Sequence, residues 1–443
     1  MANHYPNIVW IFLDQCRADV LGCYGHPFIE TPNIDRLAER GVLFESAFCN
    51  NPVCVPSRTS ILSGTYSHQN GVYDNTGRMD PRDSHLLRTF AEAGYHTANV
   101  GKIHVGLTGS EMGFDEHHEI EHDGIPHYSI PEDYPSEWPR RMFDVPDYPQ
   151  PVIYATDMCP RERTYSGVGV TGAMRIFQDH DFSASPLFLR LSLDRPHTPV
   201  SSPKPFDSMY KERTELPDFG PAEEMDQIDT LRNYRHARRW DQFTPDELLK
   251  IRYYYYGLVT HLDAELGRIL DMIWASAQRS NSIVVLAADH GCMLGEHGLQ
   301  VKTPHQYTEV ARVPLIMSWP GQLPAGKQVG ELVEMVDLLP TLCDLCTLPI
   351  PGQSAGRSLL PLINGKEPGR KMVFAEQFAP ESAHRWLGVR TQQYAYTYYP
   401  NTGEEMLFDL DTDQHERINL MNRRPPEGLV QELRSHIQTR MSA

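Results

Sequence analysis

The chain has 443 residues, a formal net charge of -18, and apolar and charged fractions typical of a soluble globular protein. The negative charge argues against nucleic acid or an anionic membrane surface as a partner, so an anionic substrate has to be held by local cations and a metal. The length is large for a single core, and it predicts two domains or one large α/β domain with an appendage.

No apolar run in the sequence is long enough to cross a bilayer, and no basic start precedes an apolar secretion segment. We therefore expect a cytoplasmic protein without a membrane partner, and the sequence leaves homo-oligomerisation open. The cysteines are scattered, which does not favour a disulfide framework. Cys343 and Cys346 have a C-x-x-C spacing, but they fall in an amphipathic segment and are expected to pack in the core.

Three apolar runs predict strands that are buried on both faces of a parallel sheet. The runs are residues 7–13, 186–193 and 282–288, and they end at Asp14-Gln15, at Asp194-Arg195-Pro196-His197 and at Asp289-His290. Ligands of open α/β sheets gather at the carboxyl ends of strands, so these polar residues are candidate ligands. Asp14 alone is equally well explained as a helix N-cap. Together, the oxygens of Asp14 and Asp289 and the imidazole of His290 would suit a divalent cation.

The segment around Cys54 predicts an anion site that contains a potential nucleophile. Pro56 follows the thiol by two positions, and proline is tolerated in the first turn of a helix, so a helix is expected to begin near Cys54. Arg58 would then lie one turn further on. The helix N-terminus and the guanidinium both favour negative charge at the thiol. The alternative is a buried cysteine with a purely structural role.

A short strand is expected over residues 95–104, and it would place Lys102 and His104 on the same face. A cation and an imidazole side by side would suit an anion clamp and an acid–base pair. The same alternation is also typical of a solvated strand face.

The remaining patterns predict helices, loops and a second domain. Helices are expected at residues 31–38, 85–93, 165–179 and 253–273. Residues 106–165 and 201–246 are expected to be long loops, which often bind substrate. After residue 366 the sequence changes to short strands and a final helix at 429–441. This predicts a catalytic domain over residues 1–366 and a C-terminal α+β subdomain over residues 367–443.

The run Cys54-Val55-Pro56-Ser57-Arg58 resembles the C-x-P-S-R signature of the formylglycine-dependent (type I) sulfatases, in which the cysteine is oxidised after translation to an aldehyde. The rest of the family pattern follows in order at Gly101-Lys102-Ile103-His104, Pro196-His197, Asp289-His290-Gly291, Gly295-Glu296-His297-Gly298 and Lys302. The resemblance therefore covers nearly the whole chain. It implies the α/β fold of the alkaline phosphatase superfamily: a large mixed, mostly parallel sheet flanked by helices, with a small C-terminal antiparallel sheet plus helix.

The resemblance also implies a set of roles. One divalent metal ion is expected, calcium first and manganese or zinc as alternatives, and a maturation enzyme would make formylglycine from Cys54. The implied metal ligands are Asp14, Gln15, Cys54, Asp289 and His290. The implied catalytic residues are Cys54, Arg58, Lys102, His104, His197 and Lys302, and the implied substrate-binding residues are Lys102, His197, Lys302 and Arg195. His104 would take the hydroxyl proton when sulfate leaves, whereas the leaving oxygen would be protonated by His197 or by Lys302.

We therefore expect a hydrolase of sulfate monoesters that acts on a small anionic substrate. The polar loops favour a sulfated carbohydrate, with aryl sulfates as fortuitous substrates. Gln15 and His290 depart from many sulfatases and resemble the phosphonate monoester hydrolase branch, so hydrolysis of phosphonate monoesters or phosphodiesters is the alternative. His290 also resembles the choline sulfatases. A non-catalytic protein that binds sulfated glycans is disfavoured, because every catalytic position holds a competent residue.

Overall fold

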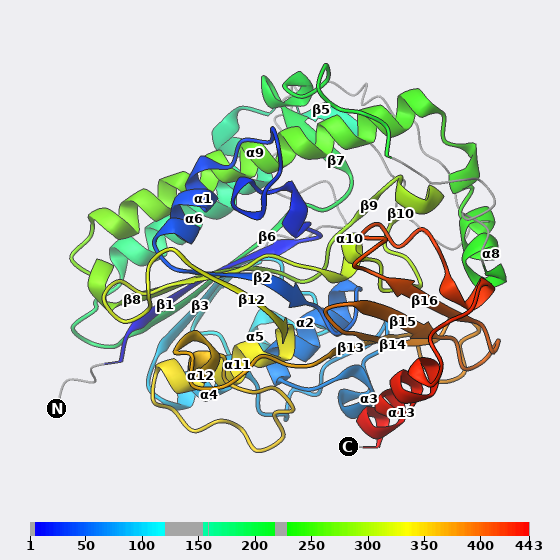
Figure 1. Cartoon of the computed structure of the whole chain (residues 1–443). Coiled ribbons are helices and arrows are strands. Elements are labelled where there is room, and N and C mark those ends of the chain that lie inside the picture. The colour runs from blue at the N-terminus through cyan, green and yellow to red at the C-terminus, as the bar shows by residue number, and fades with distance from the viewer. Residues whose placement is uncertain (1–4, 120–153, 158, 218–227, 443) are drawn as a thin grey trace.

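The structure is a computed structural model that describes residues 5–119, 154–157, 159–217 and 228–442. An eight-stranded sheet forms its centre (Figure 1). Its strands are, in spatial order, β12 (Lys327–Glu334), β2 (Val42–Phe48), β11 (Leu315–Ser318), β8 (Ser282–Ala288), β1 (Asn7–Asp14), β6 (Leu187–Pro196), β3 (His96–Gly101) and β4 (Glu116–His118). All neighbours are parallel except at β11, which is antiparallel to both β2 and β8. This confirms the predicted mixed, mostly parallel sheet.

The central strands β8, β1 and β6 are buried along their whole length, as their apolar sequences predict. They run in parallel, so their carboxyl ends meet at one edge of the sheet. The pairing between β1 and β6 shifts register after Leu13, so that Asp14 lies opposite Pro196. The residues that follow the three strands are thereby brought together at this edge.

Helices cover both faces of the sheet (Figure 1). One face carries α1 (Pro32–Glu39), α6 (Tyr165–Asp179) and α9 (Pro245–Ala275), and the other carries α2 (Cys54–Ser63), α4 (Leu86–Glu92) and α11 (Leu338–Leu345). The predicted helix at 253–273 begins earlier than expected, at Pro245. Thr244 caps it, because its hydroxyl accepts from the Glu247 N–H while the Glu247 carboxylate accepts from the Thr244 N–H. Among the described residues, no helix has the length and apolar character needed to span a membrane.

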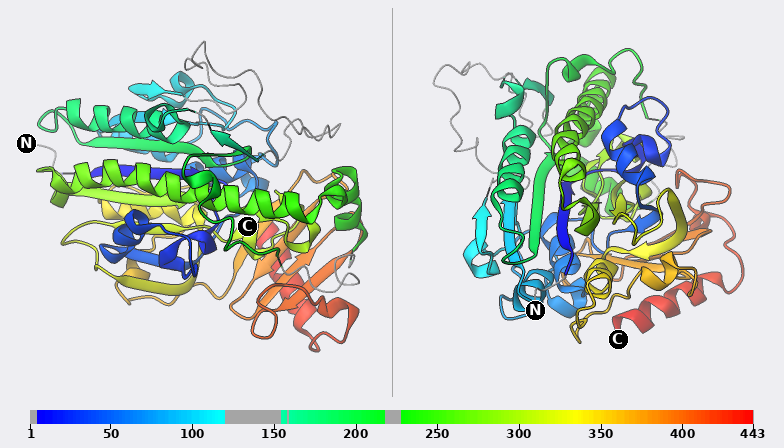
Figure 2. Two further views of the ribbon diagram at one scale, coloured as in Figure 1. Left: turned by 90° about the horizontal axis from the view of Figure 1, so that it is seen from above. Right: turned by 90° about the vertical axis from the view of Figure 1, so that its left-hand side faces the viewer.

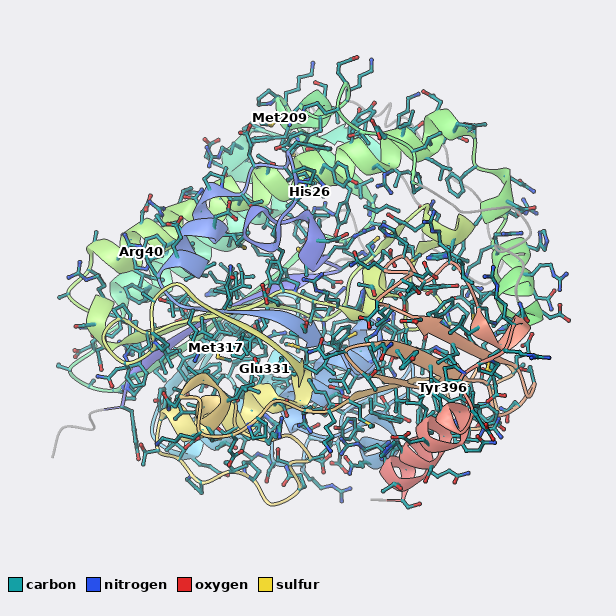
Figure 3. All side chains as sticks on the ribbon, in the orientation of Figure 1. His26, Arg40, Met209, Met317, Glu331 and Tyr396 are labelled. Atoms are coloured by element: carbon teal, nitrogen blue, oxygen red, sulfur yellow. The ribbon has the colours of Figure 1, made fainter. Side chains whose placement is uncertain are left out.

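A small antiparallel sheet and a helix form the C-terminal part, which lies beside one end of the large sheet (Figure 2). Its elements are β13 (Val373–Gln377), β14 (Trp386–Arg390), β15 (Tyr394–Tyr398), β16 (Glu405–Asp409) and α13 (Leu429–Met441). Tyr396 is fully buried where α13 packs on this sheet through Leu433 and Ile437 (Figure 3). The predicted subdomain fold is confirmed, whereas the boundary at residue 366 stays a prediction.

Glu334, at the end of β12, joins the two parts of the chain. Its carboxylate accepts hydrogen bonds from the Tyr66 hydroxyl at 2.8 Å and from the Phe374 N–H at 2.7 Å. Arg370 forms an ion pair with it at 3.1 Å. Because Glu334 is completely buried, each of these donors compensates for the loss of water around the carboxylate.

Smaller elements lie between the main ones. They are α3 (Ser67–Asn70), α5 (Gly109–Met112), β5 (Tyr154–Asp157), β7 (Val200–Pro203), α8 (Asp229–Ala237), β9 (Met293–Leu294), β10 (Gln300–Val301), α10 (Thr308–Ala311) and α12 (Leu360–Ile363). The two predicted loop regions therefore contain some regular structure, since β5 and β7 pair in parallel. Residues 120–153 and 218–227 of these regions lie outside the described residues. All eight cysteines are unpaired, and Cys343 and Cys346 are buried in the core, as predicted.

Candidate active site

Four potential metal-ligating side chains meet where β1 and β8 end and α2 begins. One donor atom from each of Asp14, Cys54, Asp289 and His290 lies within 4.8 Å of the others, and all four residues are buried. Cys54 Sγ lies 3.7 Å from Asp14 Oδ1 and 3.3 Å from His290 Nε2. α2 begins at Cys54, so the thiol stands at a helix N-terminus as predicted.

The donor set fits a divalent cation. His290 Nδ1 lies 2.7 Å from the Gly291 carbonyl oxygen, which can only accept, so Nδ1 carries a proton and Nε2 is the nitrogen whose lone pair a cation in the cluster would bind. The Gln15 Oε1 atom is buried and has no hydrogen-bond partner among the described residues. A divalent cation can be coordinated by two carboxylates, an imidazole nitrogen and an amide oxygen, which are the types of donor found here.

The backbone of Gln15 is held in an unusual conformation. Its φ angle is 61°, in the left-handed region that residues other than glycine rarely adopt. Its N–H donates to Asp289 Oδ1 at 3.0 Å, and its carbonyl accepts from the Tyr255 hydroxyl at 2.7 Å. Such strain persists only where surrounding contacts fix it, and it is typical of functional sites.

Arg58 lies behind the two carboxylates and is completely buried. Its Nη2 is 3.0 Å from Asp14 Oδ2, and its Nε is 2.8 Å from Asp289 Oδ2. Its other two hydrogen bonds within the described residues go to Ser192 Oγ and to the Lys102 carbonyl. In this structure Arg58 therefore orients the carboxylates, and its implied catalytic role stays a prediction.

Lys102 and His104 reach the cluster from a turn, so the prediction that they share a strand face is wrong. β3 ends at Gly101, whose φ is 94°, and a Cβ atom there would come within 2.0 Å of the Ser192 carbonyl. The chain leaves the strand at this glycine, and His104 has a φ of 50°. Lys102 Nζ lies 2.6 Å from Asp14 Oδ2, and His104 is close enough to Cys54 to help lower the pKa of its thiol.

His197 and Lys302 form a buried pair. Lys302 Nζ lies 3.1 Å from His197 Nε2. His197 Nδ1 lies 2.5 Å from the Thr198 carbonyl, to which it can only donate, so Nδ1 carries a proton and Nε2 is the ring nitrogen that faces Lys302. Arg195 instead folds back on its own loop and donates to the carbonyls of His197 and Pro199. Its predicted role in binding substrate stays a prediction.

The electrostatics of the cluster favour a negative charge at Cys54. Burial would raise the pKa of this thiol, but Lys302 and Lys102 outweigh it, and the pKa lies well below its usual value. Burial would also raise the pKa of Asp14, but the neighbouring cations hold it far below its ordinary range. Burial and the nearby Asp14 raise the pKa of Asp289. Shifts of this kind, produced by burial and specific charged partners, are common at catalytic sites.

Several residues of the site were not identified from the sequence. Ser192 holds Arg58, Tyr255 holds the Gln15 backbone, and the Gln15 amide Nε2 donates to Cys292 Sγ at 2.9 Å. Asn75 Oδ1 accepts from the Val55 N–H at 3.1 Å, in the first turn of α2. These side chains come from distant parts of the chain, and no local spacing indicated them.

The fold and the site suit a hydrolase of anionic esters, because the buried group of Asp14, Cys54, Asp289 and His290 could bind a divalent cation. Comparison with protein families makes the class more specific. The family described as sulfatase matches residues 6–348, and the family described as N-sulphoglucosamine sulphohydrolase, C-terminal, matches residues 295–443. The chain belongs to the sulfatase family, which confirms the resemblance found in the sequence.

Sequence relatives agree with this assignment, and a solved structure shares the fold. The chain is 31% identical to an arylsulfatase of Clostridium perfringens, over 94% of this chain and 90% of the relative. It is 26% identical to an N-acetylglucosamine-6-O-sulfatase of Bacteroides thetaiotaomicron, over 94% and 83%. A solved structure of a phosphonate monoester hydrolase of Agrobacterium radiobacter has a TM-score of 0.80, with 23% identity and coverage of 99% and 95%. The last likeness shows a shared fold.

The chain is accordingly a sulfuric ester hydrolase that cleaves sulfate monoesters, as predicted. Membership of the family implies a bound metal and a formylglycine, and the buried group of Asp14, Cys54, Asp289 and His290 could bind the metal.

Proposed function

We propose that this sulfatase removes sulfate from a sulfated carbohydrate, using a nucleophile made from Cys54. One observation carries the proposal: Cys54, at the start of α2, meets two carboxylates, an imidazole and two lysines in one buried cluster. The metal ligands would be Asp14, Gln15, Cys54, Asp289 and His290. A divalent cation bound there would polarise the sulfate oxygens and neutralise their charge. Calcium is favoured because oxygen donors outnumber the single nitrogen, and that nitrogen keeps manganese and zinc as alternatives.

The environment of Cys54 supports its role as the nucleophile. Formylglycine at this position would supply a hydrated aldehyde whose hydroxyl can attack sulfur. The helix start and the lysines stabilise negative charge at residue 54. His104, which helps to lower the pKa of Cys54, would take a proton from this residue when sulfate is released.

The pair of Lys302 and His197 would protonate the leaving oxygen. With a neutral ring, His197 Nε2 would accept from Lys302 Nζ, and the exchangeable proton of this pair would reside on the lysine. We therefore assign the proton donor to Lys302 and the orienting acceptor to His197. Lys102, beside Asp14, would balance the charge of the non-bridging sulfate oxygens together with Lys302.

The carbohydrate assignment rests on the relative named as an N-acetylglucosamine-6-O-sulfatase and on the polar composition of residues 106–165 and 201–246. The test is a panel of sulfated mono- and oligosaccharides beside aryl and alkyl sulfates, assayed by sulfate release. At least one sulfated sugar should exceed every aryl sulfate in kcat/KM, and Cys54→Ala should be inactive on all of them. Turnover of aryl sulfates with none of any sugar would refute the carbohydrate assignment and leave the sulfatase assignment standing.

Hydrolysis of phosphonate monoesters is the second candidate. It is favoured by Gln15 and His290 and by the fold shared with a phosphonate monoester hydrolase. Parallel kcat/KM measurements on an aryl sulfate and on an aryl phosphonate monoester decide between the two. We expect the sulfate to be preferred, and a clear excess on the phosphonate would reverse the order.

A further inference from the structure

Only one of the two polar atoms of the Gln15 side chain has a hydrogen-bond partner among the described residues. Its Nε2 donates to Cys292 Sγ at 2.9 Å, while its Oε1 is buried with no partner within the described part of the chain. Both residues are completely buried, so water cannot readily exchange with either end of the amide. The two ends of an amide differ in chemistry, and only the oxygen can bind a cation.

Cys292 holds the nitrogen end of the Gln15 amide. A thiol has one proton, and Cys292 Sγ donates it to the Met293 carbonyl at 3.3 Å. A carbonyl cannot donate in return, so the sulfur is left as an acceptor for the Gln15 N–H. In the flipped amide, Oε1 could be satisfied only if the thiol proton left the Met293 carbonyl, and the NH₂ group would take the place of the oxygen.

The position of Cys292 is fixed in turn. Arg17 Nη1 donates to the Cys292 carbonyl at 3.3 Å, and the Cys292 N–H donates to the Glu309 carbonyl at 2.8 Å. The Gln15 backbone is fixed independently by Tyr255 and Asp289. The Gln15 side chain therefore joins two fixed positions, its own backbone and Cys292. The amide could still rotate about the last side-chain bond, and the contact with Cys292 prevents that rotation.

We infer that Cys292 is a positioning residue that turns the Gln15 amide oxygen toward the bound cation and thereby raises metal affinity. This inference rests on the proposed function, in which Gln15 is a metal ligand. Outer partners that orient metal ligands typically change metal affinity by about 10- to 100-fold when they are removed. A neutral, fully oriented amide would give this site one fixed oxygen donor without adding negative charge.

The test is titration calorimetry of the purified full chain, freed of metal by chelation, with calcium chloride and then with manganese chloride. Cys292→Ala should weaken calcium binding about tenfold, because the amide can then rotate. Cys292→Ser keeps an acceptor and should retain most of the affinity. Cys343→Ala is the matched control, since it removes another completely buried thiol from the core. All variants are compared in the same maturation state.

A double-mutant cycle separates positioning from general damage to the fold. In a Gln15→Ala background, Cys292→Ala should cause no further loss of calcium affinity, because there is no amide left to orient. In chelator, Cys292→Ala and the control Cys343→Ala should each lower the unfolding temperature through the loss of a buried thiol, and only Cys292→Ala should also lose part of the stabilisation that added calcium gives the parent.

Two results would overturn the inference: parent-like affinity in Cys292→Ala, or an equal loss of affinity in the Gln15→Ala background. If Cys292→Ala fails to weaken binding although Gln15→Ala does, the positioning role is refuted and the ligand assignment stands. If Gln15→Ala itself leaves calcium affinity unchanged, the assignment of Gln15 as a ligand is refuted, and the inference falls with it.

Discussion

Replacing Arg58 by methionine should destabilise the chain strongly, because Arg58 forms ion pairs with two buried carboxylates at once. Its guanidinium lies 3.0 Å from Asp14 and 2.8 Å from Asp289, and all three side chains are fully buried. Removing one partner of a buried ion pair costs about 3–5 kcal/mol, because the other charge is left uncompensated. We expect a loss of this size in the free energy of unfolding, measured by urea denaturation in chelator.

Two variants sharpen this test. Arg36→Met removes a cation from an exposed ion pair of similar length, 2.7 Å to Asp271, and should cost no more than about 1 kcal/mol. Combining Arg58→Met with Asp14→Asn should cost less than the two separate losses, since the two side chains interact directly. An Arg58→Met chain as stable as the parent in chelator would refute the argument that this arginine holds the carboxylates in place.

Three further predictions follow from particular contacts. Thr244→Ala should lower stability by about 1 kcal/mol through loss of the α9 cap, and Thr244→Ser should be near neutral in the same urea titration. Burial and Glu296 raise the pKa of Glu309 from 4.5 to about 8, so the folded chain keeps a proton there that the unfolded chain loses. The contribution of Glu309 to the free energy of unfolding therefore falls as pH rises from 4.5 to about 8. In Glu309→Gln, the free energy of unfolding should depend less steeply on pH over this range, and an unchanged dependence would contradict the raised pKa of Glu309. Lys302→Ala should reduce kcat much more for alkyl than for nitrophenyl sulfates, because only poor leaving groups need the proton, whereas equal reductions would exclude Lys302 as the acid.

The elements that position the site could largely be predicted from the sequence. The sequence shows a local pattern, in which an apolar run is followed at once by Asp14 or by Asp289 and His290. Parallel strands bring their carboxyl ends to one edge of the sheet, so this pattern is enough to predict that these residues meet. The helix start at Cys54 is equally local, since proline and the following residues determine it.

Other features depended on contacts that no local pattern records. The strand before Lys102 stops because Gly101 approaches the carbonyl of Ser192 on the neighbouring strand, so the turn reflects pairing between segments far apart in sequence. Likewise, the contact between Gln15 and Cys292 joins residues separated by 277 positions. Ser192 occurs within an apolar run, where its hydroxyl gives no sign that it holds an arginine.

The arrangement of charges explains how an acidic protein can bind an anionic ester. With a net charge of -18, the chain as a whole repels such a substrate. The cations of the site lie in two positions with different partners. Arg58 is buried behind Asp14 and Asp289 and neutralises them, whereas Lys302 contacts the His197 imidazole and lowers the pKa of Cys54, so its charge acts where the nucleophile stands. Local burial strengthens this charge relative to the distant surface acids, which solvent and salt screen. The sulfate group is therefore selected at the strand ends by a few unscreened cations, while the surface charge governs solubility.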